Sequence, residues 1–162
     1  MFADGYAISF EAFVGFVITV LGLWFVVQQL REAKLASQME GLLMISDRST
    51  SFLTKQWPNL KKLVEKDDWA EISDEEAYSL IFDHKARYEA FRTMGGINEL
   101  LGTLVKRKAL DKAIVYDYFG NASSVQWNYF ENVIRHRRKM VGFEEVAVNW
   151  EWLAQQFEKY SE

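Results

Sequence analysis

The two histidines are the first residues to consider for chemistry, because a chain without cysteine offers few other ligands for a transition metal. A di-iron site in a helical protein needs Glu-x-x-His motifs on facing helices. The residues three positions before His84 and His136 are Ile81 and Val133, so neither histidine belongs to such a motif. His84 falls instead on a predicted apolar helix face, where a hydrogen-bonded core or boundary histidine is the usual case. The sequence therefore predicts no metal site and no bound cofactor.

Motifs for covalent or phosphate chemistry are also missing from the sequence. It contains no Gly-x-Ser-x-Gly element, no phosphate-binding loop and no dinucleotide fingerprint. Gly95-Gly96 lies within a helical pattern and follows no strand, so it is not a phosphate cradle. We expect the pair to mark a kink, a close crossing of another helix or a break. We predict that the protein is not an enzyme.

One basic run, from Arg135 to Lys139 (RHRRK), could bind anions. Bases in the last turn of a helix complement the helix dipole, which makes a solvated helix end the simpler interpretation. The functional alternative is contact with anionic lipid headgroups on the cytoplasmic leaflet, made by Arg135, Arg137, Arg138 and Lys139. Nucleic acid is not expected as a partner, because the run lacks interleaved aromatic residues and the whole chain has a net charge of −4.

The elements that must position these residues are helices, and the first is a membrane anchor. Residues 12–27 carry no charge, and extension to residues 6–29 reaches the roughly 20 residues that a bilayer core requires. Glu11 is tolerable at the headgroup level, and Tyr6 and Trp24 suit the two interfaces.

A cleaved secretory signal would need bases before the apolar run and a small-residue cleavage site, which the sequence lacks. A buried helix would need partners on every side. We predict a short tail at 1–5 and a transmembrane helix at 6–29.

The flanks of this helix predict its orientation. Asp4 and Glu11, but no base, lie on the N-terminal side of the uncharged run, whereas Arg31 and Lys34 follow the helix at once. The positive-inside rule then places the N-terminus outside and residues 30–162 in the cytoplasm. Small residues recur along one stripe of the helix, where close packing against a second copy or another membrane subunit is expected; chance composition is the alternative. The stripe consists of Ala12, Gly15, Thr19 and Gly22.

The rest of the chain predicts a cytoplasmic bundle of four or five helices. Residues 30–54 are expected to continue the transmembrane helix as a stalk that ends before Trp57-Pro58. Ser73 with Glu76 predicts a capped helix start, and Gly142 predicts a helix end. A final helix from Phe143 to Phe157 should dock along one apolar seam. The fold class is all-α.

Several short motifs resemble a family of bacterial single-pass membrane proteins of unknown function. The residues that carry the resemblance are Gln29-Leu30-Arg31, Ala36, Gln38, Trp57-Pro58, Asn98-Glu99-Leu100-Leu101 and Ala109-Leu110-Asp111. The resemblance implies an N-terminal span with a helical cytoplasmic domain, and it implies no activity. We therefore predict a non-enzymatic, membrane-anchored interaction or scaffold module, such as an accessory subunit of a membrane assembly. The alternative is a tethered regulatory or sensor domain that binds a ligand in its helical bundle.

Overall fold

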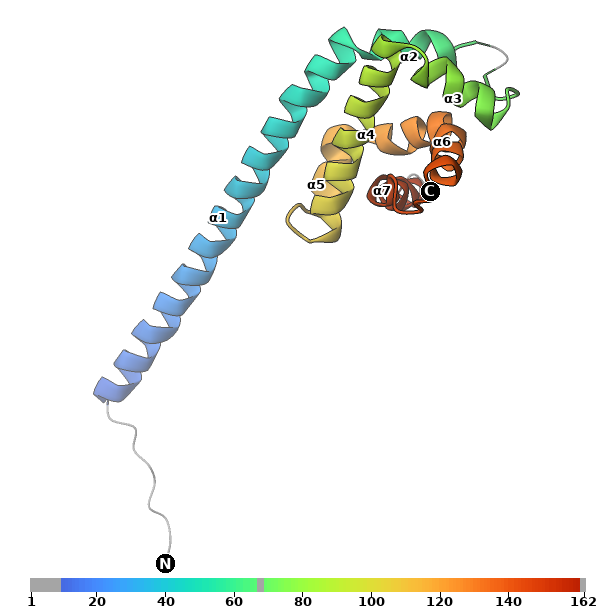
Figure 1. Ribbon diagram of the computed structural model, residues 1–162. Coiled ribbons are helices and arrows are strands. Elements are labelled where there is room, and N and C mark those ends of the chain that lie inside the picture. Colours follow the sequence, from blue (N-terminus) through green and yellow to red (C-terminus); the bar gives the residue numbers. More distant parts are fainter. Residues whose placement is uncertain (1–9, 67–68, 161–162) are drawn as a thin grey trace, which may run out of the picture. The chain divides into compact units, whose positions relative to one another are not determined.

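The computed structural model describes residues 10–66 and 69–160, and these form seven helices and no strand (Figure 1). The predicted all-α fold class is confirmed. The predicted tail at 1–5, the start of the predicted span and the side chains of Glu11 and Ala12 lie outside the described part. The chain divides into two compact units, Met1–Glu40 and Gly41–Glu162, and each is considered by itself.

Helix α1 (Phe10–Lys55) is one continuous helix of 46 residues. No proline interrupts it, and Gly41 lies within it without ending it. The helix stops next to the tryptophan-proline pair, where α2 (Trp57–Val64) begins with its proline in the first turn. Proline suits that position because the first helical N–H groups have no partner within the helix.

Helices α3 (Asp74–Phe82) and α4 (Lys85–Lys106) replace the single interrupted helix that the apolar pattern predicts. The predicted start is confirmed, since the Glu76 backbone N–H donates to Ser73 Oγ at 3.2 Å. The break falls at Asp83 and His84, and α4 runs straight through Gly95-Gly96. Arg87 stabilises the break, because its Nη1 donates to the carbonyl oxygen of Leu80 at 2.9 Å, in the last turn of α3.

Helices α5 (Lys112–Phe119) and α6 (Ala122–Val141) meet at Gly120, which has a φ of 58° that favours glycine. Helix α6 ends at Gly142 in the left-handed conformation, as predicted. Helix α7 (Val148–Glu158) begins five residues later than predicted. Ala147 adopts a left-handed conformation immediately before it, and Phe143 is exposed rather than part of the seam.

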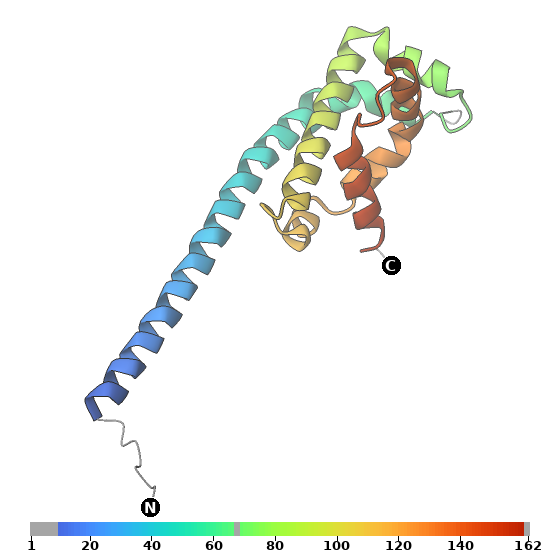
Figure 2. The ribbon, with the colours of Figure 1, turned by 60° about the horizontal axis from the view of Figure 1, so that its bottom comes forward.

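The core of the second unit lies where α4 crosses α7. These two helices make the most extensive contact, while α6 packs on both α3 and α7 (Figure 2). The predicted seam of α7 is buried at Trp150, Leu153 and Phe157. Six helices follow α1 in the described chain, rather than the predicted four or five. The largest fully buried side chains are Trp150, Phe130, Phe157, Leu42, Leu60, Leu63, Ile81, Met94, Ile134 and Leu153.

Candidate functional site

The N-terminal part of α1 exposes a continuous set of large apolar side chains. The helix contains an 18-residue stretch that is long and apolar enough to cross a membrane, and none of that stretch is buried. The exposed fraction is 67% at Phe16, 64% at Ile18 and 62% at Phe25. Soluble proteins rarely expose a contiguous apolar patch of this size. Such a patch typically marks a surface that contacts a membrane, a protein partner or a ligand.

The predicted packing stripe lies on this part of the helix, at Gly15, Thr19 and Gly22 for the residues whose side chains are described. A Cβ atom added at either glycine would meet nothing within 4 Å, so no contact among the described residues requires glycine there. Thr19 Oγ1 donates to the Gly15 carbonyl oxygen at 2.8 Å, which satisfies the hydroxyl within its own helix. The described residues of the stripe therefore leave space for a second helix, and the Thr19 hydroxyl needs no partner from that helix.

The basic residues at the end of α6 have different partners and do not act as a single patch. Arg135 pairs with Glu131 one turn earlier on the same helix. Arg137 lies over the ring of Phe82, 4.9 Å from its centroid. Lys139 is exposed and lies 3.9 Å from an Asp74 carboxylate oxygen.

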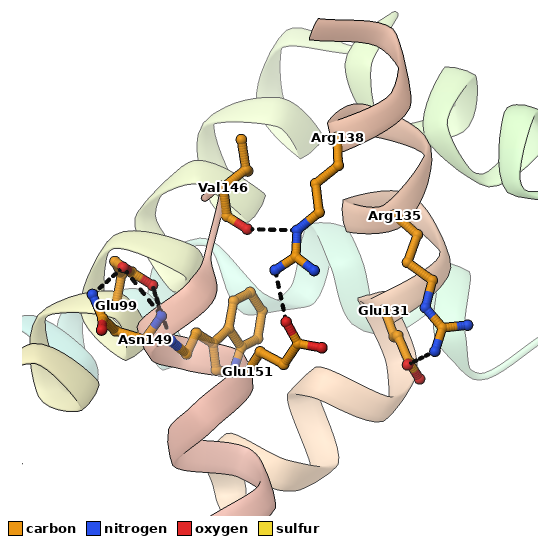
Figure 3. A network of polar contacts seen from close by, with 8 residues as sticks. Glu99, Glu131, Arg135, Arg138, Val146, Asn149 and Glu151 are labelled. Atoms are coloured by element: carbon orange, nitrogen blue, oxygen red, sulfur yellow. Dashed lines mark hydrogen bonds and ion pairs between the residues drawn. The ribbon is translucent and has the colours of Figure 1, made fainter. Parts of the chain in front are cut away.

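Arg138 is held inside the domain, unlike its neighbours. Its Nε donates to the Val146 carbonyl oxygen at 2.9 Å, and its Nη2 donates to Glu151 Oε2 at 2.8 Å (Figure 3). Only 12% of its side chain is exposed. The guanidinium thus joins the end of α6 to α7 and to the turn before it. The predicted lipid contact then depends on Arg135, Arg137 and Lys139.

The two histidines occupy different environments. His84 is exposed and precedes α4 as its N-cap residue, so the prediction of a core or boundary histidine on an apolar face is wrong. The apolar pattern continues across the helix break, which hides the break from sequence reasoning. His136 is partly buried beside Tyr78, with 5.1 Å between ring centroids. Within residues 10–66 and 69–160, no three His, Cys, Asp or Glu residues form a group that could hold a metal ion.

A pocket of about 300 Å³ lies between α3, α4, α6 and the start of α7. Its apolar lining includes Phe82, Phe91, Ile134 and Trp150. Its charged lining consists of Arg92, Arg137 and Glu99. Sequence reasoning missed this site. The one indication in the sequence is Gly95-Gly96, which lines the pocket but is predicted to mark a kink, a close crossing of another helix or a break.

Glu99 has a structural role at the edge of this pocket, because it caps α7 from a neighbouring helix (Figure 3). Ala147, the N-cap residue of α7, has no side chain that can accept from the first turn. Glu99 Oε2 accepts from the backbone N–H groups of Asn149 at 3.1 Å and Trp150 at 2.9 Å. Glu99 Oε1 accepts from Asn149 Nδ2 at 2.7 Å. A carboxylate at a helix N-terminus also gains from the helix dipole.

Replacing Glu99 with alanine should lower the free energy of unfolding by about 1–3 kcal/mol, because it leaves two N–H groups and an amide without their charged acceptor. Equilibrium unfolding of the full chain in detergent measures this change. The matched control is Glu144→Ala, which removes an exposed carboxylate and should change stability by less than about 0.5 kcal/mol. Equal effects of the two substitutions would contradict the capping role.

Comparison with known families matches the chain to a domain without an assigned function. Residues 10–157 match the family described as Domain of unknown function (DUF4760). The match covers most of the chain, so the protein belongs to this family. No curated protein and no solved structure gives a significant match.

Proposed function

We propose that the protein is a non-enzymatic, membrane-anchored interaction module. In this proposal the N-terminal part of α1 spans the bilayer, residues 30–162 lie in the cytoplasm, and the span binds a second copy or another membrane subunit. The observation that supports it best is the apolar stretch of α1, none of which is buried in the described chain. Insertion into lipid would remove that surface from water. The acids before the stretch and the bases after it support the orientation.

The anchor predicts that the full chain stays with the membrane after alkaline carbonate extraction, whereas a chain that begins at Leu35 is released. A reporter that works only in the cytoplasm should be active when fused after Glu162 and inactive when fused before Met1. Release of the full chain by carbonate would contradict the anchor. A mature protein that lacks the apolar stretch in a mass measurement would show that the stretch is a cleaved signal.

The open stripe predicts a specific effect on association. Replacing Gly15 and Gly22 together with leucine should reduce association in membranes about tenfold or more, because bulk at the contact separates the two backbones while lipid is equally apolar. Insertion should persist, since leucine is more apolar than glycine. An in-membrane association assay or cross-linking measures the change. The control is Phe13→Leu with Val20→Leu, which changes other faces of the helix and should leave association unchanged. If the glycine variant associates as well as the parent, the stripe is not a helix-packing surface.

A second function, a tethered regulatory domain that binds a ligand, is favoured by the pocket between α3, α4, α6 and α7. Purification of the full chain in a mild detergent separates the two functions. A partner in fixed stoichiometry supports the subunit function. A monomer that carries a small molecule supports the regulatory function.

A further inference from the structure

We propose that the pocket between α3, α4, α6 and α7 binds a small amphipathic carboxylate, whose apolar body lies on the aromatic floor and whose anionic group pairs with Arg92 and Arg137. This names the ligand class of the second function proposed above. It does not depend on the anchor, so the binding experiment can fail while the carbonate extraction succeeds.

The glycine pair in α4 lines the pocket, and neither close packing within the described residues nor backbone conformation requires glycine there. Glycine weakens a helix interior relative to alanine, and α4 contains two in succession at Gly95-Gly96. A Cβ atom added at Gly96 would meet nothing within 4 Å, and one at Gly95 would make only ordinary contact with Trp150, at 3.7 Å. Neither position has a positive φ. Side chains at these positions would instead occupy the pocket that both glycines line.

The floor of the pocket is suited to a flat apolar group. Phe91 packs on Phe82 with ring centroids 5.8 Å apart, and Trp150 is fully buried behind Gly95. These side chains are held by the core, so the floor exists before a ligand arrives. Ligand sites of proteins are typically apolar cavities of about 300–1,000 Å³ with a few polar groups, and the volume of about 300 Å³ suits a body of one or two rings.

The charges at the pocket favour an anion. In the part of the chain that the structure describes, no carboxylate lies within ion-pair distance of Arg92 or Arg137. Arg137 is positioned by its stacking on Phe82. The one acid in the lining, Glu99, already accepts hydrogen bonds from the first turn of α7. Guanidinium groups with free donors bind carboxylates in a two-pronged geometry.

A second hollow adds to the positive charge beside Arg92. Arg48 and Arg92 both line it, together with Thr93, Gly96 and Ile97, and no acid does. Both guanidinium groups contribute positive potential beside the pocket, which favours an anion next to Arg92. Neutral or cationic ligands gain nothing from this arrangement.

The test titrates the full chain, in nanodiscs of zwitterionic lipid, with 2-naphthoate and with its neutral analogue 2-naphthamide. Calorimetry against empty nanodiscs should show one saturable site for naphthoate. The amide should bind at least about tenfold more weakly, which is the expected scale of a charge-assisted pair. Arg92→Gln and Arg137→Gln should each weaken naphthoate binding by a similar factor. Arg92 is exposed and has no ion pair in the described chain, so its replacement leaves the fold intact.

Two further variants make the outcome decisive. Arg107→Gln removes the same charge from the C-cap position of the same helix, away from the pocket, and should leave the affinity unchanged. Gly96→Leu fills part of the pocket without meeting a neighbouring atom at its Cβ, so it should abolish binding while the thermal unfolding transition is kept. Equal binding of naphthoate and naphthamide, no saturable binding of naphthoate, or unchanged binding by Gly96→Leu would each overturn the proposal.

Discussion

Replacing Trp150 with alanine should lower the free energy of unfolding by about 3–5 kcal/mol, the range for removal of a buried aromatic side chain. Trp150 is fully buried and packs edge-on against Trp127, with ring centroids 5.5 Å apart. Its Nε1 donates to the Ser123 carbonyl oxygen at 3.0 Å, in a buried hydrogen bond that alanine cannot make. Because domains are commonly stable by about 5–15 kcal/mol, the substitution removes a large share of the total.

Helix α7 offers a matched control two residues later. Trp152 is half-buried and lies under Lys106, whose Nζ is 5.9 Å from the ring centroid. Trp152→Ala should lower the free energy of unfolding by about 1–2 kcal/mol, since less apolar area leaves contact with the protein. Urea unfolding of the full chain in detergent, followed by near-ultraviolet circular dichroism, compares the two. Equal losses would show that α7 is not docked through Trp150.

Trp150→Phe separates the contribution of the indole hydrogen bond from that of the ring packing. Phenylalanine keeps most of the ring contact but cannot donate to the Ser123 carbonyl oxygen, which keeps its helical partner in α6. The loss should therefore be about 0.5–1.5 kcal/mol, the net range for one hydrogen bond.

Local chemistry made the start of α3 and the end of α6 predictable. Ser73 and Gly142 act on the backbone within one turn, through a side-chain hydrogen bond in the first case and a left-handed conformation in the second. Such interactions depend on neighbouring residues only. The same holds for the buried seam of α7, which follows from helical spacing of its apolar residues.

The features that sequence reasoning missed depend on contacts between distant residues. Helix α7 begins at Val148 because Arg138 holds the turn before it and Glu99 caps its first N–H groups. Neither partner can be assigned without knowing which helices meet. The pocket is hidden for the same reason: Gly95-Gly96 is visible in the sequence, but the walls that α3, α6 and α7 supply are not.

Glycines of α4 show how tertiary contact decides the role of a residue. The sequence predicts a kink, a close crossing of another helix or a break at residues 95 and 96, whereas the close crossing in α4 occurs at Gly102. A Cβ atom added there would lie 2.6 Å from the Asn149 carbonyl carbon and closer still to its oxygen, whereas real Cβ atoms essentially never approach within 3.0 Å. The obstacle is backbone in the first turn of α7, which cannot rotate away as a side chain can.

Gly102→Ala should therefore lower the free energy of unfolding by about 3 kcal/mol, at the upper end of the usual range for overpacking. The expected gain in helix propensity, about 1 kcal/mol, is too small to offset the displacement of α7 and of the Glu99 cap. Gly96→Ala is the matched control in the same helix. It meets no atom, so the propensity gain alone remains and the variant should be more stable than the parent by up to about 1 kcal/mol.

The opposite signs of these two effects make the comparison decisive. Both substitutions add one methyl group to one helix, so differences in composition, charge and detergent binding cancel. Urea unfolding of the two variants and the parent, under one set of conditions, gives both changes. If Gly102→Ala were as stable as Gly96→Ala, α7 could not lie against α4 at Asn149. The capping role of Glu99 and the wall that Trp150 gives the pocket would then both be lost, because each requires that crossing.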